Sequence, residues 1–154
     1  MAKLRHIALS VPDPEKAADF YCEAFDMQRV GTTDSPLAQG VYVSDGVVTM
    51  ALLKYKTDTW AGYVAGEDER GKDYVGIHHL GFWVDDLTEA EAKIDQAGGK
   101  YFMGRPTEDA PTTFYEMKFR DLNGIIVDVT HLGWRGSVKD VVSKTEAGQE
   151  KVER

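Results

Sequence analysis

The sequence repeats one short pattern about half the chain apart, and this repeat limits the folds that are open to it. Residues 6–13 read His-Ile-Ala-Leu-Ser-Val-Pro-Asp, and residues 79–86 read His-Leu-Gly-Phe-Trp-Val-Asp-Asp. In both copies a His opens an alternating run, a Val closes it and an Asp follows. A helix-like segment and then strand-like segments come after each copy. An internal repeat of this kind predicts a fold made of two similar units.

The alternation within each copy predicts a strand and the direction of its His. Successive side chains of a strand point to opposite faces. Ile7, Leu9 and Val11 therefore share one face of the first strand, and His6 lies on the other. The same spacing in the second copy sets His79 opposite its apolar residues. Two equivalent histidines that point away from the core suggest a shared cavity.

Both copies lead into the same order of elements. Asp13 and Pro14 are typical of the start of a helix, and Asn123 with Gly124 is a strong signal for a hairpin turn. The expected strands are residues 3–11, 27–32, 40–44 and 47–54 in the first unit and 77–84, 100–103, 112–119 and 125–130 in the second. Each unit therefore reads as βαβββ.

The length and composition favour a single domain. With 154 residues and 42% hydrophobic content, the chain can bury one core, which we expect over residues 1–134. The expected class is α+β, with two tandem βαβββ modules at residues 3–54 and 76–134 whose curved mixed sheets enclose a metal and substrate cavity. Residues 55–75 match neither module and form either a linker or a flap whose aromatics cover a ligand. Residues 135–154 are polar and read as a flexible tail.

The charge and the cysteine content restrict the partners and the compartment. The formal net charge of −8, with no basic cluster, argues against nucleic acids and anionic membranes as partners. Cys22 is the only cysteine, so no disulfide can form within the chain, and a reducing compartment is expected. No apolar signal region or long apolar run is present. We therefore expect a cytoplasmic protein that acts on a small molecule.

An acidic residue interrupts the last apolar strand. Ile125, Val127 and Val129 share one face of this strand, and Asp128 lies on the other. Aspartate is a poor strand former, and burying an unpaired carboxylate is costly. A metal cation or a buried hydrogen-bond network would explain this aspartate.

His6, His79 and Asp128 form the candidate metal site. Two imidazoles and one carboxylate on three strands could bind one side of an ion and leave the opposite positions open, as in non-haem Fe(II) sites. Fe(II) is the favoured ion, and Mn, Ni, Co or Zn could use the same ligands.

These features resemble the vicinal oxygen chelate superfamily, which includes glyoxalase I, extradiol dioxygenases, methylmalonyl-CoA epimerase and the bleomycin- and fosfomycin-resistance proteins. The resemblance rests on the duplicated module, the two opening histidines and the Asp-Leu-Asn-Gly-Ile-Ile-Val-Asp ending at residues 121–128. It covers residues 3–134 and implies that His6, His79 and Asp128 correspond to the family's metal ligands. The family's usual ending is Asp-Pro-Asp-Gly-Asn-x-x-Glu, so Asp128 stands where a longer Glu is common.

The resemblance leaves several activities open. Met50 aligns opposite Asp128 at the family's fourth ligand position, and a thioether is a poor ligand for a hard divalent ion. A site with three protein ligands is similar to that of the extradiol dioxygenases, so a ring-cleaving dioxygenase is the leading expectation. The alternatives are a glyoxalase-like lyase, isomerase or epimerase, and a resistance-type protein that binds a small molecule without turnover. The resemblance also implies a homodimer.

Further side chains are candidates for the site. Glu116 and His131 are candidates for an acid–base role, although the strand around Glu116 has no fixed face at this stage. Trp60, Trp83 and Tyr115 are candidates for substrate contacts. Strict alternation sets His78 on the face opposite His79, where packing or hydrogen bonding is expected.

Overall fold

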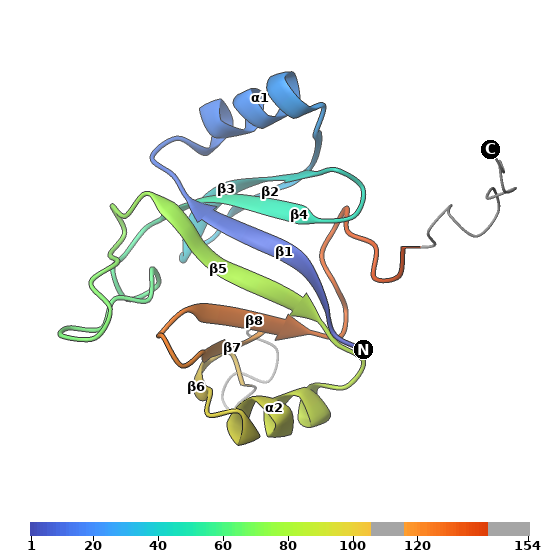
Figure 1. Ribbon diagram of the computed structural model, residues 1–154. Coiled ribbons are helices and arrows are strands. Elements are labelled where there is room, and N and C mark those ends of the chain that lie inside the picture. The colour runs from blue at the N-terminus through green and yellow to red at the C-terminus, as the bar shows by residue number, and fades with distance from the viewer. Residues whose placement is uncertain (106–115, 142–154) are drawn as a thin grey trace, which may run out of the picture.

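The computed structural model describes residues 1–105 and 116–141. This part of the chain forms one eight-stranded sheet and two helices (Figure 1). In chain order the elements are β1 (Lys3–Ser10), α1 (Pro14–Phe25), β2 (Gln28–Asp34), β3 (Ala38–Ser44), β4 (Thr49–Tyr55), β5 (Gly76–Trp83), α2 (Leu87–Gln96), β6 (Lys100–Met103), β7 (Met117–Arg120) and β8 (Ile126–Thr130).

The strand order shows the two modules directly. It runs β2-β3-β4-β1-β5-β8-β7-β6, so each module contributes four neighbouring strands and the two first strands meet at the centre. β1 is parallel to β4, and β5 is parallel to β8, whereas β1 and β5 are antiparallel. The predicted α+β class and the repeat of βαβββ are therefore confirmed.

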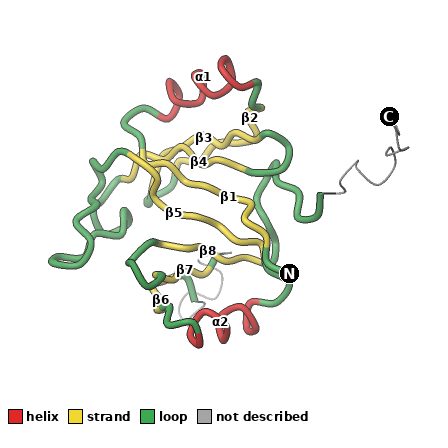
Figure 2. The backbone as a smooth tube through the Cα atoms, viewed as in Figure 1, coloured by secondary structure: helices red, strands yellow, loops and turns green. Residues whose placement is uncertain are grey.

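The helices cover the two ends of the curved sheet, α1 over the first module and α2 over the second (Figure 2). Each helix begins at an aspartate that caps it, since Asp13 accepts from Lys16 N at 3.1 Å and Asp86 from Glu89 N at 2.8 Å. Under α1 the core contains Ala18, Val41, Val43 and Leu52, and under α2 it contains Val84, Met117, Phe119 and Val129.

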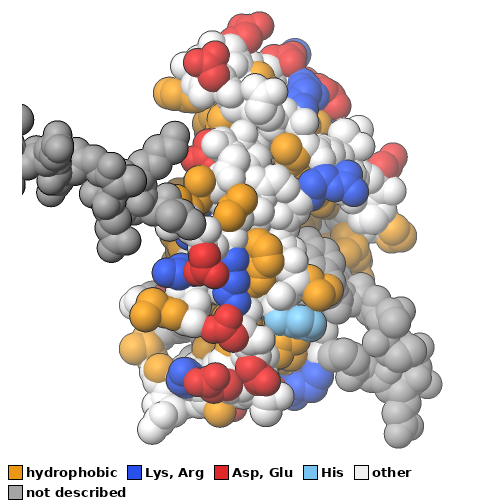
Figure 3. Space-filling view, turned by 90° about the vertical axis from the view of Figure 1, so that its right-hand side faces the viewer, with side chains coloured by type: hydrophobic (Ala, Val, Ile, Leu, Met, Phe, Trp, Pro, Cys, Tyr) orange, Lys and Arg blue, Asp and Glu red, His pale blue; other side chains and the backbone are white. Residues whose placement is uncertain are grey.

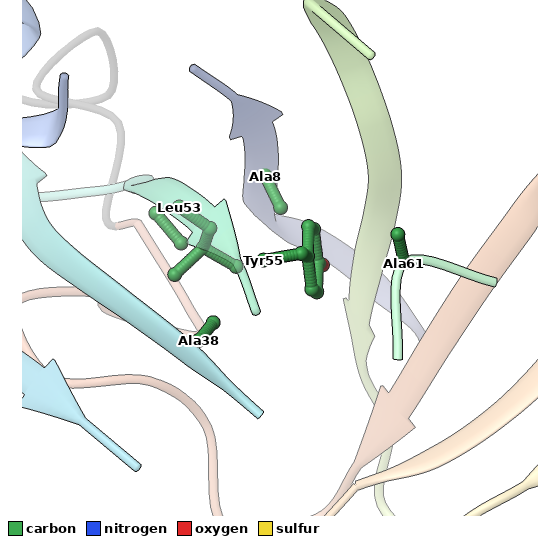
Figure 4. Packing of buried hydrophobic residues seen from close by; sticks show 6 residues of the cluster. Ala8, Ala38, Leu53, Tyr55 and Ala61 are labelled. Carbon is green, nitrogen blue, oxygen red and sulfur yellow. The ribbon is translucent and has the colours of Figure 1, made fainter. Parts of the chain in front are cut away.

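A third cluster lies on the face of the sheet away from the helices. Tyr55 at the end of β4 lies between Ala8 of β1 and Ala61 of the connection between the modules, with Leu53 and Ala38 beside it (Figure 4). Trp60 packs on the same cluster. Trp60 and Ala61, in the connection between the modules, thus pack against the sheet. The linker and flap interpretations of residues 55–75 stay predictions.

The segment after β8 returns to the first module. The hydroxyl of Thr49 donates to Arg135 O at 2.6 Å, and that of Ser44 donates to Gly136 O at 2.5 Å. Val138 N donates to Val47 O at 3.2 Å. Residues 135–138, which the sequence assigns to a polar tail, are therefore packed, while residues 142–154 of that tail lie outside the described residues.

The surface carries charges of both signs. On the face shown in Figure 3, groups of Asp and Glu side chains and of Lys and Arg side chains lie among hydrophobic and other residues. Within the described residues, the helices are too short or too polar to cross a membrane. The expected homodimer and the cytoplasmic location stay predictions.

Candidate active site

A cavity of about 250 Å³ lies between the two modules, on the side of the sheet away from the helices. Its floor is ionisable and its walls are mainly apolar. The floor is formed by His6, His79, Glu116 and Lys118. The walls include Leu37, Ala38, Ala51, Leu53, Tyr55, Trp60, Phe102, Met103 and Ile126.

His6, His79 and Asp128 lie together, as the sequence predicts. The Nε2 atoms of the two histidines are 3.3 Å apart, and His79 Nε2 is 3.2 Å from Asp128 Oδ2. Gly81 makes this approach possible, because it pairs with both His6 and Asp128 across the sheet. A Cβ atom at Gly81 would lie 2.6 Å from His6 Cβ. All three ionisable side chains are buried.

The fourth ligand position is occupied by Ala51, so the alignment that placed Met50 there is wrong by one residue. In the second module Asp128 pairs with Gly81, and the equivalent pair in the first module is Ala51 with Ala8. Met50 points to the other face, where it packs in the core under α1. Ala51 lines the cavity, and its methyl side chain has no donor atom.

His78 also points inward, against the alternation that the sequence predicts. In the pairing of β5 with β1, His79 is opposite Ala8 and Ile77 is opposite Leu9, so His78 is an extra residue in a β-bulge. The bulge resets the alternation and buries both neighbouring histidines on the cavity side. Ile77 takes the exposed position instead, at 59% exposure.

A chain of hydrogen bonds assigns the protons of these imidazoles. His78 Nε2 is 2.6 Å from the carbonyl oxygen of Ala61, which only accepts, so Nε2 carries the proton of a neutral His78. His78 Nδ1 must then accept, and its single lone pair is shared between His79 Nδ1 at 2.9 Å and the hydroxyl of Tyr55 at 3.2 Å. His79 consequently carries its proton on Nδ1 and presents a bare Nε2 to the site.

Lys118 is the cation of the floor. It lies opposite Asp128 in the pairing of β7 with β8, and its ammonium forms an ion pair with Asp128 Oδ2. The same ammonium is 3.3 Å from Glu116 Oε2. Trp134 completes the arrangement, since its indole Nε1 donates to Glu116 Oε1 and its ring stacks on His6 at 4.8 Å between centroids. Glu116 and Lys118 are therefore held in place from several sides.

Burial sets the protonation of the imidazoles. Desolvation lowers the pKa of both His6 and His78 to about 4, and it lowers that of the fully enclosed His79 well below its usual value. All three imidazoles are consequently neutral at pH 7.

The two carboxyl groups respond differently to the same ammonium. Burial and the charge of Glu116 raise the pKa of Asp128, although Lys118 opposes them. Burial also favours the neutral form of Glu116, but Lys118 acts together with His6, Trp134 and Asp128 to outweigh it, and the pKa of Glu116 is lowered to about 2. Burial disfavours the charged form of Lys118, but Asp128 and Glu116 raise its pKa above the usual value. Glu116 is thus the ionised carboxylate that faces the cavity.

The remaining predicted site residues are placed as follows. Trp60 lines the cavity. Trp83 packs on Gly133 and donates to the backbone oxygen of His131 at 3.0 Å. The side chain of His131 is exposed. Tyr115 lies outside the described residues.

The sequence interpretation missed Lys118. A signal was present, because Glu116, Lys118 and Arg120 alternate with Met117 and Phe119 along one strand. Such a pattern predicts one charged face and one apolar face, but only the pairing with β8 shows that the charged face lines a cavity.

Comparison with known proteins agrees with this architecture. The family model described as the Glyoxalase/Bleomycin resistance protein/Dioxygenase superfamily matches residues 3–129. The chain belongs to this superfamily. The resemblance predicted from the sequence is confirmed at that level.

The individual proteins that resemble this chain are only distantly related to it in sequence. An ethylmalonyl-CoA/methylmalonyl-CoA epimerase of Cereibacter sphaeroides is 26% identical over 139 residues, which cover 84% of this chain and 97% of that protein. A hypothetical protein of Bacillus halodurans C-125 has a crystal structure with a TM-score of 0.64 and 17% identity, covering 93% of this chain and 99% of its own.

A second solved structure is that of a methylmalonyl-CoA epimerase from Streptomyces coelicolor, in a single-residue variant and bound to 2-nitronate-propionyl-CoA. It has a TM-score of 0.59 and 15% identity, and the match covers 82% of this chain and 94% of that one. At these identities the two solved structures establish the fold alone.

The superfamily resemblance implies a divalent ion on His6, His79 and Asp128, but the site as built does not fit one. The separations of 3.2 and 3.3 Å between the donor atoms suit a common ion. However, the ammonium of Lys118 is already bound to the carboxylate oxygen that such an ion would use. Across residues 1–105 and 116–141, no three His, Cys, Asp or Glu side chains are arranged as a metal site.

Proposed function

We propose that this chain catalyses proton transfer at a carbon atom next to a carbonyl group, which is the chemistry of an epimerase or isomerase. The observation that carries the proposal is the pair of Glu116 and Lys118 on the cavity floor, a carboxylate and an ammonium 3.3 Å apart. Abstraction of such a proton creates negative charge on the carbonyl oxygen. A base can accept the proton, and a fixed cation beside it can stabilise the negative charge on the oxygen.

The roles of the two groups follow from their charges. The substrate carbonyl binds at the ammonium of Lys118, and Glu116 accepts the proton from the neighbouring carbon. When the carbonyl replaces the carboxylate as a partner of Lys118, Glu116 loses one of the contacts that lower its pKa and becomes a stronger base. The ammonium then stabilises the enolate oxygen.

An epimerase must also return a proton from the opposite face of the carbon. His6 and His79 are the other ionisable groups of the floor, and either imidazole can take up a proton from solvent and pass it to that face, while Glu116 releases to solvent the proton that it accepted. The buried Asp128 does not line the cavity, so it acts through Lys118 and not on the substrate.

The nature of the substrate follows from the cavity and from the relatives. A volume of about 250 Å³ with apolar walls suits a short acyl group. The Cereibacter sphaeroides relative is named for ethylmalonyl-CoA and methylmalonyl-CoA, two thioesters of branched malonic acids. We propose a small 2-substituted acyl thioester as the substrate.

This proposal departs from the leading expectation of a ring-cleaving dioxygenase. That reaction needs open coordination positions on an iron held by His6, His79 and Asp128, and Lys118 lies on the carboxylate of that set. The relatives described above that carry a named activity are epimerases. Both observations favour the epimerase or isomerase alternative.

Solvent exchange tests the proposal. In D₂O the protein should incorporate deuterium at C2 of methylmalonyl-CoA or ethylmalonyl-CoA, as followed by NMR. Glu116→Gln should lower the exchange rate by about 100-fold or more, because it removes the proton acceptor. Glu23→Gln, which changes an exposed glutamate of α1, is the matched control and should exchange at the wild-type rate.

Two results would contradict this function. One is an absence of exchange with both thioesters although they bind, which would favour the resistance-type binding protein. The other is an equal exchange rate in Glu116→Gln and the wild type, which would assign the proton transfer to another group.

A further inference from the structure

The carboxylate of Asp128 is shared between two different sites, the predicted metal site and the ion pair with Lys118. The Oδ2 atom of Asp128 is 3.2 Å from His79 Nε2, as a ligand of a common ion would be. The ammonium of Lys118 contacts that same oxygen. A metal ion and this ammonium would therefore compete for one position.

From this geometry we infer that the ammonium of Lys118 takes the place of the divalent ion in this chain, so that the site works without a metal. The inference rests on the positions of the side chains. It depends on the proposed function only for the use made of the positive charge, which is to stabilise an enolate oxygen.

The ammonium is fixed, so it cannot simply make room for an ion. Lys118 lies opposite Asp128 in the strand pairing, and its side chain is only 15% exposed. Glu116 holds it from the other side at 3.3 Å. The second oxygen of Glu116 already accepts from the indole of Trp134, which keeps this carboxylate turned toward the lysine.

The balance of charge gives the same result. Glu116 and Asp128 are two carboxyl groups around one ammonium. The ammonium already offsets one of the two negative charges that these carboxyl groups can carry. A divalent ion would leave an excess of positive charge beside an ammonium whose side chain is only 15% exposed.

The same count predicts what removing the lysine does. Without Lys118, two imidazoles and two carboxyl groups remain, and the two negative charges that the carboxyl groups can carry match a divalent ion. The methionine side chain has a similar length and no charge, so Lys118→Met should convert the floor into a metal site. The wall at Ala51 adds no ligand and leaves open space for water on such an ion.

Titration with Co(II), followed by visible absorption and by metal analysis after dialysis, tests the inference. The wild type should take up no stoichiometric cobalt. Lys118→Met should bind one equivalent at least about 100-fold more tightly, with visible ligand-field bands. Adding His79→Ala should abolish this binding. Lys93→Met, which removes an exposed lysine paired with Glu89 on α2, should behave as the wild type.

One equivalent of cobalt bound by the wild type, with bands that vanish in His79→Ala, would overturn the inference. A folded Lys118→Met that binds no cobalt would overturn it as well. If Lys118→Met does not fold, the titration of the folded wild type alone decides between uptake and no uptake. Because the readout is metal binding, a failure of the proposed proton transfer would not alter any of these results.

Discussion

At the scale of single residues, the site depends on keeping ionisable groups away from water. Three imidazoles and two carboxyl groups are packed around one ammonium, and their hydrogen bonds form one connected network. The backbone oxygen of Ala61 fixes the first proton of that network, at His78. Ala61, which is far from His79 in the sequence, thus determines which nitrogen of His79 carries the proton.

The neutral histidines predict a specific dependence of stability on pH. Burial lowers the pKa of His6 and His78 to about 4 from a usual 6.5, so the unfolded chain binds more protons than the folded one between these values. The contribution of these histidines to the free energy of unfolding is therefore fully present above pH 6.5, and it is lost as the pH decreases toward 4. At pH 5.5, each of these imidazoles should lower the free energy of unfolding by about 1 kcal/mol.

Urea unfolding at pH 7.5 and pH 5.5 measures this loss. His78→Asn should flatten the dependence, because it removes one of the buried groups. His131→Asn changes an exposed histidine and should leave the slope as in the wild type. Equal slopes for the wild type and His78→Asn would show that His78 does not contribute to the linkage.

At the scale of elements, the close meeting of β1, β5 and β8 decides whether the side chains converge. Gly81 is the residue on which this depends, since a Cβ there would lie 2.6 Å from His6 Cβ and 2.7 Å from the ring of Trp134. Gly81→Ala should destabilise the fold by about 1–3 kcal/mol, as overpacking does, and should lower the exchange activity by displacing His6 or Trp134.

The control for this change is Gly31→Ala. A Cβ at Gly31 would meet the end of the flexible Arg135 side chain at 3.1 Å, which can move aside. Unfolding midpoints of the two variants, with tryptophan fluorescence as the probe of Trp134, provide the comparison. Equal stability of Gly81→Ala and Gly31→Ala would mean that the strands can separate at no cost.

Much of the arrangement of helices and strands could be predicted from the sequence, because this arrangement depends on the periodicity of apolar residues. The repeat around His6 and His79 predicted the two modules. The sequence also predicted correctly that β1, β5 and β8 lie side by side. What could not be predicted depends on register. One extra residue at His78 reverses its direction, and a shift of one residue exchanges Met50 for Ala51. Likewise, the pairing of Lys118 with Asp128 exists only once β7 and β8 are aligned.

At the scale of the whole molecule, two connecting segments join the modules and border the site. Residues 55–75 leave the first module and are bound by the second, because Arg120 of β7 donates to Gly62 O at 2.8 Å and to Asp68 at 2.7 Å. Residues 135–138 return from the second module to the first. Each module therefore binds a segment that continues from the other module. The cavity between the modules depends on these contacts.

Asp68 is the centre of the first of these ties. Its carboxylate binds Arg70 at 2.6 Å and also binds Arg120. The two arginines, of which Arg70 has the larger effect, hold the pKa of Asp68 well below the usual range despite its burial. The tie consequently persists until strongly acidic pH. Since Trp60 and Ala61 lie in the segment that it holds, the tie also supports a cavity wall and the oxygen that orients His78.

Asp68→Asn should therefore loosen residues 57–70 without unfolding the sheet. The amides of Ala61, Gly62 and Tyr63 are hydrogen-bonded within this segment, and their hydrogen exchange should become about 10-fold faster, whereas that of β1 and β5 should not change. Substrate affinity should fall with the same variant, because Trp60 loses its support. Asp73→Asn, three residues beyond this segment and with an exposed side chain, is the control. If the three amides exchange at wild-type rates in Asp68→Asn, the packing of Ala61 and Trp60 on Tyr55 holds this wall without the arginines.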